Sequence, residues 1–124
     1  MKDTKILLIE SDKNSIFIIT RLLHINCLDN LVIAKNGFDA VKKIKEESFD
    51  LILTELNVPG IDGLQITRIC RQMSSYKDIP IVLITTQSFN YISEECSEAG
   101  VTNFIAKPID KEVFIKTIKT HIKF

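Results

Sequence analysis

The sequence predicts an α/β fold of the doubly wound type, in which a parallel sheet carries helices on both faces. Short apolar runs alternate with longer helical patterns five times along the chain. Three of these runs, KILLI, LILTE and IVLIT, are almost entirely hydrophobic. Such runs are typical of parallel strands that are covered on both faces. Regular alternation of this kind indicates right-handed crossovers between parallel strands.

The expected strands and helices follow from the apolar periodicity and the turn residues. The strands are expected at Lys5–Ile9, Leu31–Ala34, Leu51–Glu55, Ile81–Thr85 and Asn103–Ala106. The helices are expected at Lys13–Ile25, Gly37–Glu46, Gly63–Met73, Tyr91–Ala99 and Lys111–Ile122. Asp12 or Ser11 can cap the first helix, and Gly100 marks the end of the fourth. Because no linker, repeat or low-complexity segment interrupts the pattern, residues 1–124 are expected to form a single domain.

Size, charge and cysteine content argue against several classes of protein. The chain has 124 residues, enough for one ordinary core. Its 16 basic and 16 acidic residues give a formal charge of +0 and no general attraction to nucleic acid or to an anionic membrane. No apolar stretch is long enough to span a membrane, so a cytoplasmic protein is expected. Cys27, Cys70 and Cys96 lack metal-ligand spacing and are expected to be reduced thiols.

Polar residues follow the ends of four expected strands. In a doubly wound sheet, ligands and chemistry gather at the carboxyl ends of the strands. One polar residue at a strand end is usually a helix cap or a solvent contact, but four converging ends predict a functional or vestigial site. These residues are Glu10, Ser11 and Asp12 after the first strand, Glu55 at the third, Thr85 and Thr86 at the fourth, and Lys107 at the fifth.

Three segments of the chain resemble the receiver domain of bacterial two-component response regulators. They are FDLILTELNVPGIDG (residues 49–63), IPIVLITT (79–86) and GVTNFIAKP (100–108), and the similarity extends over essentially the whole chain. The resemblance implies a flavodoxin-like, CheY-like sheet of five parallel strands in the order 2-1-3-4-5. It also implies that Thr85 and Phe104 are switch residues. Lys107 then matches the lysine that contacts the phosphoryl group, and its bond to Pro108 is typically cis in this family.

The chain departs from the family at all three of its site aspartates. Glu55 matches the phosphorylated aspartate, while Glu10 and Ser11 match the acidic pair. Glutamate moves the carboxylate by on the order of 1 Å, and such a misplacement can cost about a hundredfold in a positioned reaction. Ser11 offers a neutral hydroxyl, a poor ligand for Mg²⁺. Glu10, Ser11, Glu55 and Asn57 are therefore expected to be vestigial magnesium positions, with Mg²⁺ weakly bound if at all and no other cofactor.

These changes predict a signalling module rather than an enzyme. On this interpretation the chain is a pseudo-receiver that acts through protein–protein interaction without phosphorylation. The alternative is a functional receiver that accepts a phosphoryl group from a histidine kinase or phosphotransfer protein with Mg²⁺. A small-ligand binder of the flavodoxin type is a third class, but no phosphate-cradling loop rich in Ser, Thr or Gly follows the first strand.

The resemblance leaves two roles open for Glu55. In the first, its carboxylate forms a salt bridge with Lys107 that stabilises the fold. In the second, it also accepts a hydrogen bond from Thr85 and draws that side chain inward, so that Phe104 turns inward too. The second role would hold the domain near an active-like conformation.

The first helix carries more apolar residues than its buried face needs. Four of them, at helical spacing, suffice for that face. Ile16 and Phe17 are then expected to be exposed near the candidate site at the carboxyl ends of the strands. Together with Pro108, they are candidates for contact with a histidine kinase, a phosphotransfer protein or an effector protein. The four expected buried residues are Ile18, Ile19, Leu22 and Leu23.

Charged stripes lie on the fourth and fifth helices. Such stripes are usually solvated faces. Their opposite charges would also support a homodimer through the fourth helix, fifth strand and fifth helix, as in the receiver family that the chain resembles. The acidic stripe is Glu94, Glu95 and Glu98, and the basic stripe is Lys111, Lys116, Lys119 and Lys123.

Overall fold

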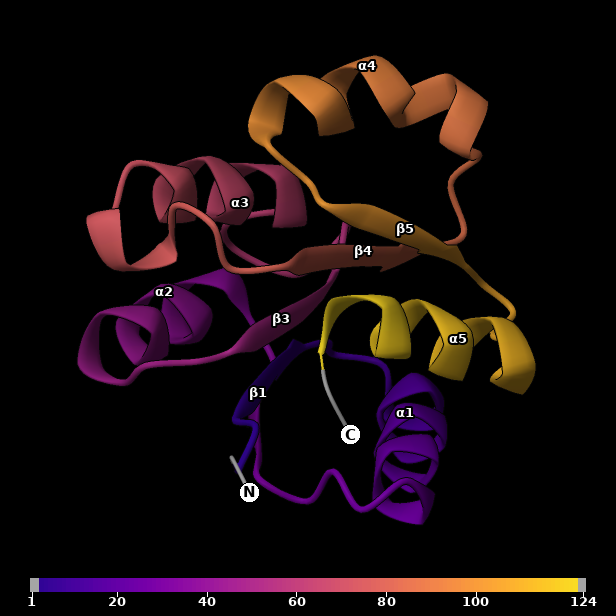
Figure 1. The fold of residues 1–124 in the computed structure, drawn as a ribbon. Helices are drawn as coiled ribbons and strands as arrows, with labels where there is room; N and C mark the ends of the chain where they lie inside the picture. The colour runs from indigo at the N-terminus through magenta and orange to yellow at the C-terminus, as the bar shows by residue number, and fades with distance from the viewer. Residues whose placement is uncertain (1–2, 123–124) are drawn as a thin grey trace.

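Five parallel strands form the central sheet of the computed structural model, in the order β2-β1-β3-β4-β5 (Figure 1). The structure describes residues 3–122. The predicted doubly wound architecture and its strand order are confirmed. The strands are β1 (Ile6–Ile9), β2 (Leu31–Ala34), β3 (Leu51–Glu55), β4 (Ile81–Thr85) and β5 (Asn103–Ala106).

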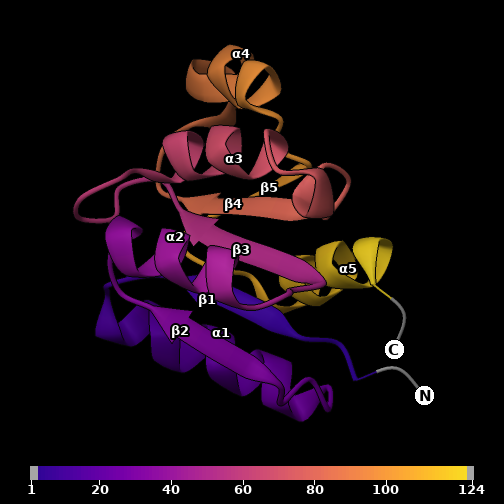
Figure 2. The same ribbon diagram turned by 90° about the vertical axis from the view of Figure 1, so that its left-hand side faces the viewer.

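Helices cover both faces of the sheet. Helices α1 and α5 pack on one face, and α2, α3 and α4 lie on the other, with α3 in the middle (Figures 1 and 2). The helices are α1 (Lys13–Ile25), α2 (Gly37–Glu46), α3 (Gly63–Arg71), α4 (Phe89–Ala99) and α5 (Lys111–His121), and a 3₁₀ turn covers Ser74–Tyr76.

The apolar strand residues divide the core between the two faces. Successive residues of a strand point to opposite faces. Ile6 and Leu8 of β1 therefore pack under α1 and α5, where Phe114 is fully buried. Leu7 and Ile9 pack under α2 and α3. A strand buried on both faces needs a nearly continuous apolar run, which explains the sequence pattern.

The predicted ends of two helices differ from the observed ones by two residues. Helix α3 ends at Arg71 rather than Met73, because the chain tightens into the 3₁₀ turn. Helix α4 begins at Phe89 rather than Tyr91, after Ser88 in an extended conformation. The other ends agree within one residue. Gly100 ends α4 in the left-handed conformation, as predicted.

Helix α1 buries a different face from the one predicted. Ile19 and Leu23 are fully buried, and Ile16 is half-buried against the core, whereas Ile18 is 44% exposed. The predictions that Ile16 is exposed and Ile18 buried are therefore wrong. Positions 16, 19 and 23 share one helical face, and position 18 lies about 100° around the helix from position 19. Phe17 is 64% exposed, as predicted.

Aspartate substitutions at positions 16 and 17 should destabilise the protein to different degrees, because Ile16 is half-buried and Phe17 is exposed. Ile16→Asp should lower the free energy of unfolding by about 2–3 kcal/mol, because it places a carboxylate against the core. Phe17→Asp should lower it by about 1 kcal/mol or less, since the ring loses mainly its contact with Arg21, whose guanidinium lies 5.9 Å from the ring centroid. Urea denaturation at neutral pH measures the free energy of unfolding of both variants. Equal decreases in that free energy would contradict the assignment of the buried and exposed faces of α1.

The structure also bears on the predicted thiols and on the search for membrane-spanning helices. Cys27 is an exposed free thiol, and Cys70 and Cys96 are buried free thiols, so the expected unpaired state is confirmed. Burial raises the pKa of Cys70 to about 11. Within residues 3–122, none of the helices has the length and apolar character needed to cross a bilayer.

Candidate functional site

Lys107 joins two carboxylates at the carboxyl edge of the sheet. Its Nζ donates to Glu10 Oε1 at 2.6 Å and to Glu55 Oε1 at 3.0 Å. Glu10 directly follows β1, Glu55 is the last residue of β3, and Lys107 directly follows β5. The structure therefore brings together three of the four predicted strand ends through direct contacts. The predicted Glu55–Lys107 salt bridge is present.

Backbone amides hold the other two carboxylate oxygens of this cluster. Glu10 Oε2 accepts from the amides of Ser11 and Asp12, at 3.1 and 3.2 Å. Glu55 Oε2 accepts from the amide of Leu56 at 2.6 Å. All four carboxylate oxygens thus have a donor within the protein. Sequence reasoning missed these amides, because nearly every residue type supplies the same N–H group.

The cluster is largely shielded from water. The side chain of Glu10 is 3% exposed, and those of Glu55 and Lys107 are each 12% exposed. Burial alone would lower the pKa of the Lys107 ammonium. The hydrogen bonds and charges of Glu10 and Glu55 outweigh burial, however, and raise its pKa above the ordinary lysine value. Lys107 is therefore held as a cation between two acids.

The loop after β3 is closed tightly against Glu55. The amide of Gly63 donates to the carbonyl of Leu56 at 2.9 Å. A Cβ at position 63 would lie 2.5 Å from the carbonyl oxygen of Glu55, so glycine permits this close approach. Asp62 then caps α3 by accepting from the amide of Gln65. The closure fixes the Leu56 amide that orients the Glu55 carboxylate.

Thr85 is fully buried at the end of β4, but no hydrogen bond joins it to Glu55 within the described chain. Its hydroxyl accepts from the amide of Gln87 at 3.3 Å. The second role left open for Glu55 needs this bond, whereas its two carboxylate oxygens accept from Leu56 and Lys107 instead. The contact through which Glu55 would draw Thr85 inward is missing.

Phe104 lies against α4 rather than within the cluster. It is half-buried, and its ring packs edge-on to Phe89 with the ring centroids 5.3 Å apart. Around it lie Leu83, Ile92 and Cys96. The expected inward position of Phe104, coupled to Thr85 and Glu55, therefore has no direct contact to support it.

The donors at the cluster match a magnesium ion poorly. Mg²⁺ requires near-octahedral oxygen ligands, usually carboxylates and water. The carboxylates of Glu10 and Glu55 already bind an ammonium, and Asp12 is turned away to cap α1 through Ser15. Ser11 supplies a neutral, exposed hydroxyl. Among residues 3–122, no three His, Cys, Asp or Glu side chains gather in a way that could hold a metal ion.

The remaining predicted residues lie at the surface around the cluster. Asn57, Thr86 and Pro108 are exposed. The Lys107–Pro108 peptide bond is cis, as the resemblance implies. These residues border the site but make none of the hydrogen bonds that hold its two carboxylates.

The sheet order and the acid–lysine cluster at its carboxyl edge define a receiver-type α/β domain. The response regulator receiver domain model matches residues 6–119, and the chain belongs to that family. Receiver domains are signalling modules of two-component systems that interact with histidine kinases, phosphotransfer proteins and effectors.

Two relatives with about one third identical residues match the chain along nearly its full length. The osmosensing histidine protein kinase SLN1 of Saccharomyces cerevisiae is 33% identical over 121 residues, which cover 94% of this chain and 10% of the kinase. The response regulator ArlR of Staphylococcus saprophyticus is 33% identical over 121 residues, covering 97% of this chain and 53% of ArlR. The chain thus spans about half or less of the length of these two relatives.

Solved structures share the fold at lower sequence identity. Chemotaxis response regulator CheY4 of Vibrio cholerae aligns with a TM-score of 0.88 and 24% identity, covering 96% of this chain and 98% of CheY4. The receiver domain of the sensor histidine kinase PA1611 from Pseudomonas aeruginosa aligns with a TM-score of 0.86 and 24% identity, covering 95% and 96% of the two chains. That structure has a magnesium ion coordinated in its active site cleft.

Proposed function

We propose that this chain is a pseudo-receiver, a two-component signalling module that binds a protein partner without being phosphorylated at Glu55. It performs no catalysis of its own and needs no Mg²⁺. Its Glu10–Lys107–Glu55 cluster keeps the carboxyl edge of the sheet in one arrangement. The domain then presents its surface to a histidine kinase, phosphotransfer protein or effector protein in the cytoplasm.

The occupancy of the carboxylate oxygens carries this proposal. A carboxylate that attacks a phosphoryl group needs a free oxygen, and an assisting metal ion needs open ligand positions. Lys107 and three backbone amides donate to all four oxygens of Glu10 and Glu55, so none of these oxygens is without a hydrogen bond. Freeing them would require the breaking of charge-assisted hydrogen bonds in a site that is mostly closed to water.

A working phosphoryl-accepting receiver is the second candidate function. The observation in its favour is that Thr85 ends β4 and Lys107 directly follows β5, where the family resemblance places its switch hydroxyl and lysine. The two candidates differ in whether a phosphoryl group can be transferred to this edge of the sheet at all.

Incubation with a small phosphodonor and Mg²⁺, followed by intact-mass measurement, tests the proposal. The wild-type chain should gain no phosphoryl group, because its acids are one methylene too long and are bound to Lys107. The matched variant Glu10→Asp/Ser11→Asp/Glu55→Asp restores the three family aspartates, and it should gain one phosphoryl group. A phosphoryl group on the wild type that disappears in Glu55→Gln would overturn the proposal.

We place the partner contact on the exposed residues around this edge. Phe17 projects from the first half of α1, and Pro108 follows the lysine of the cluster. An exposed aromatic ring and a rigid proline each offer apolar area at a low cost in conformational entropy. Ile16 is half-buried and belongs to the core side of α1 rather than to this contact.

A further inference from the structure

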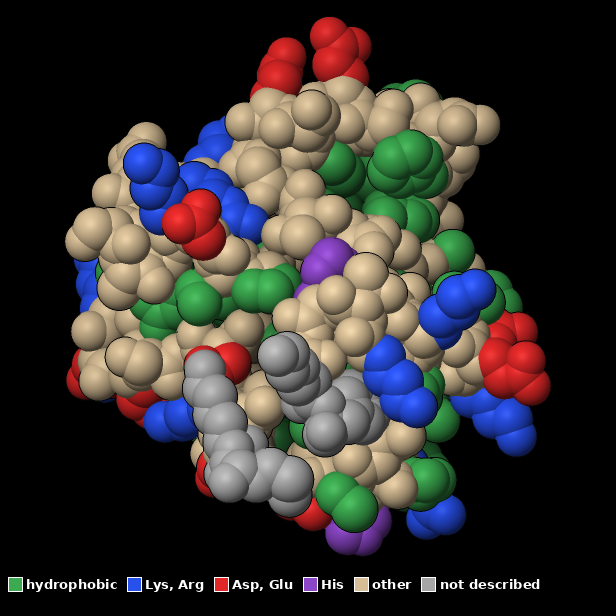
Figure 3. Space-filling view, viewed as in Figure 1, with side chains coloured by type: hydrophobic (Ala, Val, Ile, Leu, Met, Phe, Trp, Pro, Cys, Tyr) green, Lys and Arg blue, Asp and Glu red, His purple; other side chains and the backbone are tan. Residues whose placement is uncertain are grey.

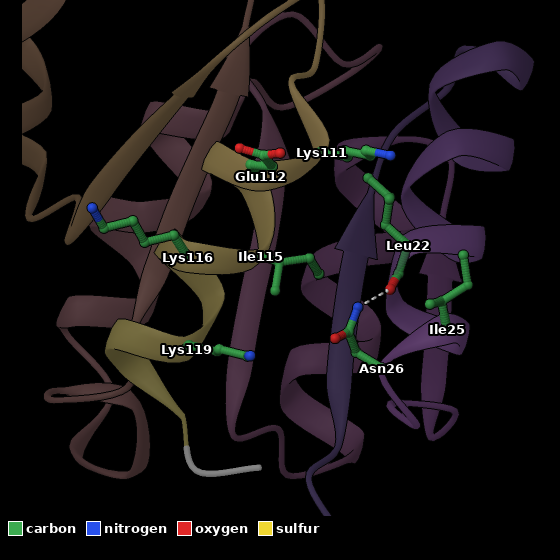
Figure 4. Close-up of a pocket in the computed structure, with 8 residues that line it drawn as sticks. All are labelled: Leu22, Ile25, Asn26, Lys111, Glu112, Ile115, Lys116 and Lys119. Atoms are coloured by element: carbon green, nitrogen blue, oxygen red, sulfur yellow. Dashed lines mark hydrogen bonds between the residues drawn. The ribbon is translucent and has the colours of Figure 1, made fainter.

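A groove of about 590 Å³ lies between α1 and α5 (Figure 4). These two helices cover the opposite face of the sheet from α4 (Figure 1). Leu22 and Ile25 from α1 and Ile115 from α5 line it with apolar side chains. Ile25 is 66% exposed, so this apolar lining is open to solvent. The groove lies along the sides of the two helices and contains none of the residues of the acid–lysine cluster.

Lysines border the α5 side of this groove. Lys111, Lys116 and Lys119 line it, together with a single acidic residue among the described lining residues, Glu112. Lys111 and Lys116 form no ion pair with another described residue. Figure 3 shows basic side chains gathered over α5. Lys123, the fourth member of the predicted basic stripe, lies outside the described residues.

Helix α4 presents the complementary surface. Tyr91 is 79% exposed, and Glu94, Glu95 and Glu98 are exposed as well. Spacings of three, four and seven residues place these side chains on one helical face. The helix contains no Lys or Arg, and the three glutamates form no ion pair with another described residue. Acidic side chains project from the α4 end of the molecule in Figure 3.

We propose that α4 of one copy docks into the α1–α5 groove of a second copy. The Tyr91 ring packs on the apolar lining, and the glutamates pair with the lysines. The lengths agree, because Tyr91–Glu98 spans about 10.5 Å of helix and Lys111–Lys119 about 12 Å. This self-association goes beyond the proposed function and does not depend on the state of the Glu10–Lys107–Glu55 cluster.

Charge and geometry favour a second copy as the occupant. The formal charge of +0 leaves little net repulsion between copies. One copy cannot fill its own groove, because α4 and the groove lie on opposite faces of the sheet (Figures 1 and 4). The contact is therefore head-to-tail, with a free groove at one end and a free α4 at the other. Association should continue beyond a dimer.

Sedimentation velocity over a range of concentrations at low salt tests this contact. The wild-type mean mass should rise past that of two chains without a plateau at the dimer, and added NaCl should reduce it. Tyr91→Ser/Glu94→Gln removes two of the docking side chains on α4. Ile25→Ser/Lys116→Gln removes an apolar side chain and a positive charge from the groove. Each variant should self-associate about tenfold or more weakly than the wild type.

Mixing the two variants provides the decisive measurement. Each retains the surface that the other lacks, so the mixture should form a closed pair of one copy of each and nothing larger. Lys42→Gln on α2 is the control and should associate like the wild type. A monomeric wild type, a plateau at the dimer, or an unpaired mixture of the two folded variants would overturn the proposal. A plateau at the dimer that survives Ile25→Ser/Lys116→Gln would instead indicate the symmetric contact through α4, β5 and α5.

Discussion

Replacing Lys107 by methionine should lower the free energy of unfolding by about 3–5 kcal/mol, because two buried carboxylates lose their shared cation. Glu10 and Glu55 are 3% and 12% exposed, so water cannot fully take over this role. Urea denaturation at neutral pH measures the loss. Lys42→Met is the matched control, since Lys42 is an exposed lysine on α2 and its loss should cost about 0.5 kcal/mol or less. Equal stability of the two variants would show that the cluster does not stabilise the fold.

The stability difference between the wild type and Lys107→Met should also depend on pH, in the alkaline range. The pKa of Lys107 is raised in the folded protein, because its bonds to Glu10 and Glu55 outweigh the effect of burial. A group of this kind contributes its full stability below its unfolded pKa of about 10.4, and the contribution is lost as the pH rises through the folded value. The difference should therefore stay constant from neutral pH to about pH 9 and narrow above about pH 10.4. Narrowing at lower pH would mean that Lys107 is not held as a cation.

The fold was predictable because local signals and packing agree along most of this chain. β3 and β4 are apolar runs that end at Glu55 and Thr85, and both strands have the predicted ends. The face of α1 was less predictable, because apolar residues lie almost all round that helix. There the choice between Ile16 and Ile18 depends on how the helix is rotated over the sheet, which composition does not reveal.

The convergence of Glu10, Glu55 and Lys107 followed from the topology, but the orientation of the carboxylates did not. Glu55 turns toward the Leu56 amide because Gly63 closes the loop onto it. In this orientation Glu55 forms no bond to Thr85 within the described chain, and the orientation depends on the path of the backbone. Residue types alone cannot distinguish one satisfied arrangement from another when several donors are within reach.

The hydrogen bonds of Arg71, away from the site, also could not be predicted from residue type alone. Its guanidinium donates to the carbonyls of Tyr76, Ile79 and Gly100 at 2.8, 2.7 and 2.9 Å, and to the hydroxyl of Thr102 at 3.0 Å. These bonds tie the end of α3 to the segments that lead into β4 and β5. Burial lowers the pKa of Arg71. In the sequence this residue is one of two arginines in the last turn of α3, without a mark that separates it from Arg68.

Arg71→Met should lower the free energy of unfolding by about 3–4 kcal/mol, since it leaves several partly buried carbonyls without their charged donor. Arg68→Met, on the exposed side of the same helix, is the matched control and should cost about 0.5 kcal/mol or less. Arg71→Lys should recover a minor part of the loss, because one ammonium cannot reproduce the planar set of donors. Urea denaturation of the three variants measures these differences. If Arg71→Met and Arg68→Met were equally stable, solvent would be satisfying the carbonyls as well as Arg71 does, and the guanidinium would not be what holds the entries to β4 and β5 against α3.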